Sequence, residues 1–167
     1  RQALPCRCAK LRRTFFAVLL LTAPAGAQAT EPRNILVLQS YHYGSAWTQT
    51  VMAGIAEVLG GRDDIALDVE YMDTKRRADE PYLRRLRHAY EEKYRDRAFN
   101  VVLACDDNAL RFLLVYRDVL FPGAPIVFCG VNHFREEMMA GHENVTGVVD
   151  EEIMPGIHLV WAEAPQI

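Results

Sequence analysis

The chain has 167 residues and a formal net charge of −3, from 19 Lys and Arg against 22 Asp and Glu. That length is about one domain. Half of the residues are hydrophobic and a quarter are charged, which excludes a disordered tail, a collagen-like repeat and a multi-span membrane protein. The small acidic excess gives no electrostatic argument for a nucleic-acid partner, because such a partner needs a clustered basic face.

Residues 1–27 have the pattern of a secretory signal peptide. Their charged side chains are all positive, namely Arg1, Arg7, Lys10, Arg12 and Arg13. An apolar run at 15–21 follows, and then Pro24 and the small triplet at 25–27 provide a cleavage site. The apolar run is shorter than the roughly 20 residues that span a bilayer. We therefore favour an export signal over an uncleaved membrane anchor and expect residues 28–167 to form one acidic, exported domain.

Apolar runs then alternate with amphipathic stretches. A continuous apolar run at 35–38 predicts a strand that is covered on both faces. Apolar residues at steps of four from Trp47 to Leu59 predict a helix, and two glycines end it. Strict alternation at 65–72 predicts a second strand, nearer an edge. The later strands are predicted at 101–104, 126–129 and 146–149, and the later helices at 83–94, 108–120, 136–140 and 151–164.

This order predicts an α/β fold. Strand-helix-strand units with apolar strands give a doubly wound, mostly parallel five-stranded Rossmann-like sheet, with helices on both faces because the crossovers are right-handed. Ligands of such sheets bind beyond the carboxyl ends of the strands, at the point where the strand order reverses. Those ends carry residues 39–44, 73–75, 105–108, 130–133 and 150–151, which include aromatic, hydroxyl, carboxylate and amide groups.

Each of these polar residues has an alternative interpretation without a ligand. An Asp or Ser before a helix caps its N–H groups, which applies to Asp106, Asp107 and Ser45. Tyr41 and Trp47 either stack on a ligand or lie buried under a neighbouring loop. Both interpretations stay open on the sequence alone.

The chain carries no sequence signature of an enzyme. There is no G-x-G-x-x-G after the first strand, no Walker loop and no G-x-S-x-G turn. A metal centre made of His42, Asp106, Asp107 and His133 is a weaker alternative, since no spacing fixes the distances among them. We expect no catalytic residue, no metal and no cofactor.

Two cysteines remain once the signal peptide is removed. The spacing of Cys105 and Cys129 matches no zinc pattern. In an oxidising compartment they either form a disulfide or stay two separate small buried thiols. We favour the separate thiols.

Four spaced blocks of the sequence resemble one known family. They are 35–42 (ILVLQSYH) with Trp47-Thr48 and Gly54-Ile55, then 70–76 (EYMDTKR), 106–113 (DDNALRFL) and 128–132 (FCGVN). From about Asn34 onward the chain is similar to the periplasmic sensor domains of bacterial histidine kinases that have the type 1 periplasmic-binding-protein fold. These domains are relatives of the ABC transporter substrate-binding proteins.

The resemblance implies a non-catalytic function in ligand recognition. Two Rossmann-like lobes would clamp a small organic ligand, and their closure would be relayed through a transmembrane helix to a cytoplasmic kinase. The ligand contacts that it implies are Ser40, Tyr41, Trp47, Asp106, Asp107, Asn108 and Asn132. Two alternatives remain, a soluble substrate-binding protein that partners an ABC transporter permease and a small exported hydrolase that uses the acidic residues.

The extent of the chain also bears on these expectations. It stops at 164–167, where the family would cross into the first strand of its second lobe. We therefore expect residues 28–167 to be the N-terminal lobe alone, with the second lobe as a missing partner. An apolar patch left exposed on that side would favour self-association.

Overall fold

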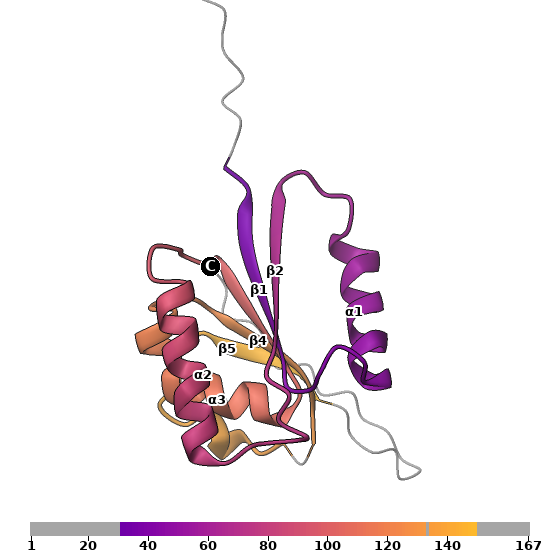
Figure 1. Cartoon of the computed structure of the whole chain (residues 1–167). Coiled ribbons are helices and arrows are strands. Elements are labelled where there is room, and N and C mark those ends of the chain that lie inside the picture. Colours follow the sequence, from indigo (N-terminus) through magenta and orange to yellow (C-terminus); the bar gives the residue numbers. More distant parts are fainter. Residues whose placement is uncertain (1–30, 133, 150–167) are drawn as a thin grey trace, which may run out of the picture.

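Five parallel strands form the sheet in a computed structural model that describes residues 31–132 and 134–149 (Figure 1). They are β1 (Arg33–Gln39), β2 (Ile65–Tyr71), β3 (Val101–Cys105), β4 (Ile126–Val131) and β5 (Val145–Val149). Their order across the sheet is β2-β1-β3-β4-β5, and every neighbouring pair is parallel. The predicted α/β fold with a doubly wound, five-stranded Rossmann-like sheet is confirmed.

The connections lie on both faces of the sheet. They are α1 (Ala46–Leu59), α2 (Glu80–Lys93), α3 (Asp107–Leu120) and the single 3-10 turn η1 (Glu136–Met139). In Figure 1, α1 lies on one side of the strands and α2 and α3 on the other. The reason is that the chain moves in one direction along the sheet from β1 to β2 and in the opposite direction from β2 to β3, so right-handed crossovers reach opposite faces.

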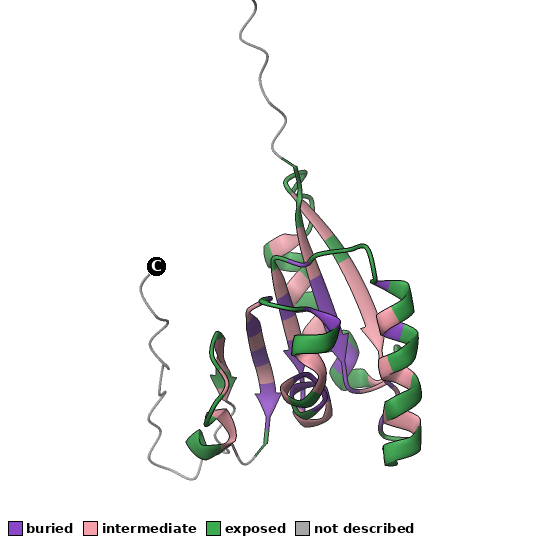
Figure 2. Ribbon diagram, turned by 90° about the vertical axis from the view of Figure 1, so that its left-hand side faces the viewer, coloured by how far each residue is buried: buried purple, intermediate pink, exposed green. Residues whose placement is uncertain are grey.

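The main hydrophobic core fills the space between the sheet and the α2–α3 layer. Side chains from alternate positions of the central strands pack there against α3 residues such as Leu110 and Leu113, both 0 % exposed. These strand residues are Leu36, Leu38, Val102, Ala104, Ile126 and Phe128. Each large apolar side chain that is fully buried contributes about 1.5–3 kcal/mol. Figure 2 shows the buried residues gathered along the middle strands.

The α1 layer is looser. Thr48 is the one buried residue of this helix, and the predicted apolar stripe of Val51, Ile55 and Leu59 is half-buried. Val58 points to solvent with 71 % of its surface exposed. The sheet is therefore anchored mainly from its α2–α3 side.

Most predicted elements agree with the structure. The predicted helix at 136–140 is a short 3-10 turn, and α2 begins at Glu80, earlier than the apolar pattern predicted, because Pro81 suits the first turn of a helix. The signal peptide at 1–27, His133 and the helix predicted at 151–164 lie outside the described residues. Among the helices that the structure describes, none combines the length and apolarity needed to cross a bilayer.

Candidate functional site

The loops that follow β1 and β3 meet where the strand order reverses. The β1 loop begins with Ser40, which is completely buried. Its hydroxyl donates to the carbonyl oxygen of Cys105 at 2.8 Å and accepts from the N–H of Ala109, also at 2.8 Å. The Ser40 side chain, which was predicted to contact a ligand, thus links the end of β1 to the start of α3.

Asp106 and Lys75 both interact with Tyr41 at this edge. The Tyr41 hydroxyl donates to the carboxylate of Asp106, and the Lys75 ammonium lies 4.1 Å from the centre of the Tyr41 ring. Burial and, to a smaller extent, the hydrogen bond to Asp106 raise the pKa of Tyr41 to about 12. An aromatic ring, a cation and a carboxylate therefore lie next to one another.

Asp106 also satisfies the capping interpretation. It is the N-cap of α3, and its side chain accepts from the N–H of Asp107 at 2.8 Å. Burial raises the pKa of Asp106, while the hydrogen bonds from Tyr41 and from that N–H oppose the rise. Ser45, the other predicted cap, precedes α1 but makes no side-chain cap bond.

Asn108 and Thr74 join the β2 loop to the same network. The Asn108 amide donates to the Thr74 hydroxyl at 2.9 Å, and this hydroxyl donates to the carbonyl of Ser40 at 2.6 Å. Thr74 is buried. The loops after β1, β2 and β3 are therefore tied together by side chains.

Asp107 connects α3 to the loop after β4. Its Oδ2 accepts from the Asn132 backbone N–H at 3.2 Å and from the Asn132 amide at 3.0 Å, and its Oδ1 lies 3.8 Å from the guanidinium of Arg111. Arg111 and Arg135 line an open depression of about 540 Å³. The Asp107 carboxylate thus borders a depression that carries two arginines.

Trp47 takes a position of its own. It belongs to the first turn of α1, and its ring lies directly against Gly130, where a Cβ atom would overlap it. Gly130 has a φ of 65°. The residue is 37 % exposed, so Trp47 both packs on Gly130 of β4 and presents part of its surface to solvent.

Six of the seven predicted site residues, all but Trp47, therefore take part in the hydrogen-bond network of this edge. The network has two groups: Ser40 and Asn108 with Thr74, and Tyr41, Asp106, Asp107 and Asn132. Sequence reasoning did not select Thr74, Lys75 and Arg111. The first two were identifiable as carboxyl-end residues of the second strand, and Arg111 lies one helical turn after Asp107.

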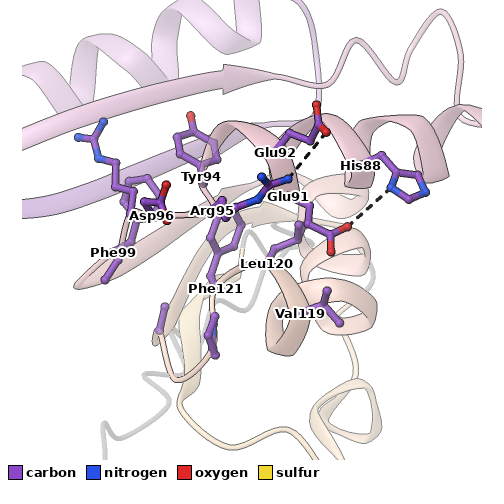
Figure 3. Close-up of a pocket in the computed structure, with 14 residues that line it drawn as sticks. His88, Glu91, Glu92, Tyr94, Arg95, Asp96, Phe99, Val119, Leu120 and Phe121 are labelled. Atoms are coloured by element: carbon purple, nitrogen blue, oxygen red, sulfur yellow. Dashed lines mark ion pairs between the residues drawn. The ribbon is translucent and has the colours of Figure 1, made fainter.

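A second cavity, of about 730 Å³, lies at the opposite end of the sheet (Figure 3). It is lined by residues that precede β3 and β4, such as Phe99 and Phe121, and by the end of α2. The ion pairs at its border, His88–Glu91 and Arg95–Glu92, join exposed side chains, and such pairs contribute about 0–1 kcal/mol. Ligands of parallel sheets bind at the carboxyl ends, so we assign the candidate site to the network and not to this cavity.

Within residues 31–132 and 134–149, no group of three or more His, Cys, Asp or Glu side chains is arranged to hold a metal ion. His133, the fourth member of the metal alternative, lies outside that part of the chain.

In comparisons with protein-family models, with curated proteins and with solved structures, no match to this chain was found.

Proposed function

We propose that this chain is the ligand-recognition lobe of an exported, periplasmic sensor domain. It binds a small organic molecule without transforming it, and the parent protein passes ligand-driven closure to a membrane histidine kinase. The observation that carries this proposal is the convergence of Lys75, Tyr41 and Asp106 at the point where the strand order reverses.

The network supports binding because its parts are held in place before a ligand arrives. Hydrogen bonds between loops join Thr74 to Ser40, Asn108 to Thr74 and Asn132 to Asp107. A preorganised site loses less conformational entropy on binding. The aromatic face of Tyr41 suits a planar or apolar portion of a ligand, and the neighbouring charges suit its polar ends.

The same contacts favour recognition over catalysis. The Ser40 hydroxyl uses its proton and an acceptor position inside the protein. The Asp106 carboxylate accepts from Tyr41 and from a backbone N–H, and Asp107 accepts from Asn132. The Ser40 hydroxyl donates to a backbone carbonyl and not to a general base, which a serine nucleophile needs.

The connection to signalling rests on the resemblance of the four sequence blocks. A ligand that contacts both lobes of a clamp favours the closed form and shifts that population. In the full-length protein, a transmembrane segment and a kinase module after a second lobe would support this proposal. A permease encoded alongside would instead support a transport receptor.

The test is a ligand screen with matched variants. Amino acids, purines and short carboxylic acids are added to the chain, and the thermal midpoint of unfolding and the heat of binding are measured. We expect one class to raise the midpoint. In Lys75→Met its binding should weaken about ten-fold or more, which corresponds to about 1.4 kcal/mol.

The control is Arg95→Met, which removes an exposed cation at the other cavity. Its binding should equal that of the unmodified chain. A ligand that is lost only with Arg95→Met would move the site to the opposite end of the sheet. If the chain hydrolyses ester, phosphate or glycoside substrates and this activity disappears in Asp106→Ala and Asp107→Ala, the protein is a hydrolase and the receptor proposal is wrong.

A further inference from the structure

The two cysteines of the sheet are direct neighbours. Cys105 ends β3 and Cys129 lies in β4, and the two are paired in the parallel register. Their sequence neighbours Ala104 and Phe128 belong to the core on the α2–α3 side. Because side chains alternate along a strand, both thiols point to the other face, the one that carries α1.

Their separation suits a covalent bond. Neighbouring strands lie about 4.7–4.9 Å apart, and disulfides form between Cα atoms about 4.4–6.8 Å apart. The sulfur of Cys105 is already in hydrogen-bonding contact with that of Cys129. Both cysteines are thiols in the structure, and only a small local adjustment is needed to bring their Cβ atoms to the distance of a disulfide.

The two thiols differ in character. Cys105 is fully buried and Cys129 is half-buried. The Cys105 thiol donates to the Cys129 sulfur, and this bond, followed by burial, raises the pKa of Cys105. Cys129 is therefore the sulfur that a reagent from solution reaches first, and Cys105 is held behind it as a protonated thiol.

We propose that Cys105 and Cys129 form a reversible dithiol–disulfide site that exchanges with low-molecular-weight disulfides such as oxidised glutathione. The Cys129 thiolate, after its proton passes to solvent, attacks one sulfur of the small disulfide. A mixed disulfide forms and one small thiolate leaves. Cys105 then loses its proton, its thiolate attacks the Cys129 sulfur, and the second small thiolate leaves and takes up a proton. The protein dithiol is oxidised and one small disulfide is reduced to two thiols.

The backbone of both cysteines also supports the neighbouring loops. The carbonyl of Cys105 accepts from the Ser40 N–H at 3.1 Å, and that of Cys129 accepts from the Asp106 N–H at 2.8 Å. Gly130, next to Cys129, contacts the Trp47 ring. A disulfide needs Cβ atoms closer together than the strand spacing, so we expect oxidation to change the surroundings of Trp47. The site does not depend on the ligand proposed above.

The experiment is equilibration of the full chain, with Cys6 and Cys8 replaced by serine, in glutathione buffers of graded redox ratio. Each sample is quenched in acid, unfolded, alkylated and mapped by mass spectrometry, so that buried thiols are counted too. We expect a linked peptide pair containing Cys105 and Cys129 that disappears as reduced glutathione is added. Finding both cysteines alkylated at every ratio would overturn the proposal.

Two single variants test the order of the steps. Cys105→Ala should accumulate one glutathionyl group on Cys129, since the resolving thiol is gone, whereas Cys129→Ala should leave Cys105 unmodified at the same ratio. Equal modification of both variants would contradict the assigned roles. A third protein keeps Cys105 and Cys129, has Cys6 and Cys8 replaced by serine, and has Trp161 replaced by Phe. Its Trp47 fluorescence should change with the fraction of linked peptide, and an unchanged spectrum would contradict the predicted effect on the surroundings of Trp47.

Discussion

Asp106 combines burial, a charge and an unusual backbone conformation. It is 6 % exposed, and its φ is 77°, a region in which residues other than glycine are strained. Its side chain caps α3 and accepts from Tyr41. Strain at a position that also holds a buried carboxylate is typical of functional sites, and this combination leads to a pH-dependent prediction.

We expect Asp106→Asn to remove part of the pH dependence of stability. Burial raises the pKa of Asp106 in the folded protein, so the folded state keeps this proton to a higher pH than the unfolded state does. Its stabilising contribution is complete below the unfolded pKa, about 3.9, and is lost as the pH rises through the folded pKa. Asparagine stays neutral over this range and has nearly the shape of the carboxyl group that it replaces.

The measurement is urea unfolding of both proteins at a series of pH values from about 3 to about 8, across the carboxylate range. The free energy of unfolding of the unmodified chain should fall relative to Asp106→Asn as the pH rises. A difference that stays constant over the whole series would show that Asp106 has the same pKa in both states.

Gly130 of β4 contacts the Trp47 ring of α1. We expect Gly130→Ala to cost about 2–4 kcal/mol, because the new Cβ adds a steric overlap with Trp47 to the cost of a positive φ. Gly123 is the matched control, since it has a φ of 75° and nothing within 4 Å of an added Cβ. Gly123→Ala should cost only about 1–2 kcal/mol.

Chemical denaturation gives both free energies, and near-ultraviolet circular dichroism reports the tryptophan. The spectrum should change in Gly130→Ala and stay the same in Gly123→Ala. Equal costs for the two variants would mean that Trp47 moves aside freely and that its packing on Gly130 is weak.

At the scale of elements, α2 presents two tyrosines to the core in different hydrogen-bonding states. Tyr94, which caps the end of the helix, donates its hydroxyl to Glu70 of β2 at 2.6 Å. The hydroxyl of Tyr90, one turn earlier, is buried with no hydrogen-bond partner among the described residues. Burial raises the pKa of both phenols, so both stay neutral donors.

We expect opposite outcomes when each hydroxyl is removed. Tyr94→Phe should destabilise the protein by about 1.5 kcal/mol, because it breaks a hydrogen bond to a charged group. Tyr90→Phe should be neutral or stabilising by up to about 1 kcal/mol, since it removes a buried polar atom that has no partner. Urea midpoints of the two variants provide the comparison, and a loss of stability in Tyr90→Phe would indicate a bound water at that hydroxyl.

Local periodicity was sufficient to predict the elements, and it was insufficient to predict their contacts. Apolar runs and steps of four predicted each described strand and the helices α1 to α3, since both periods are properties of neighbouring residues. The contact of Cys105 with Cys129 depends on β3 lying beside β4, which is a property of strand order. The structure keeps both as thiols, as the sequence favoured, and it also places them in contact, which the sequence could not indicate.

For the candidate site, the sequence likewise predicted the loops but not the contacts between their side chains. The rule on carboxyl ends identified the loops that carry Tyr41, Asp106 and Asn132. It did not identify Lys75 above the Tyr41 ring, because the direction of a loop side chain depends on its packing. Nor did it identify the positive φ of Asp106.

At the scale of the whole molecule, the apolar surface is unevenly covered. The central strands are enclosed on the α2–α3 side, while the described part of the sheet ends in two edge strands, β2 and β5. On β5, Val148 is 51 % exposed. An edge strand with exposed apolar side chains and unpaired backbone groups is a template for pairing with a second copy.

We therefore expect the chain to self-associate through β5 as its concentration rises. Val148→Lys should abolish this association, because a lysine on an edge strand opposes pairing through its charge. Val58→Lys adds the same charge at a valine on α1 that is 71 % exposed and should leave association unchanged. Sedimentation velocity at increasing concentration measures all three proteins. An unmodified chain that is monomeric at the highest concentration would rule out β5 as the contact. Equal loss of association in both variants would do the same, since of the two valines only Val148 lies on an edge strand.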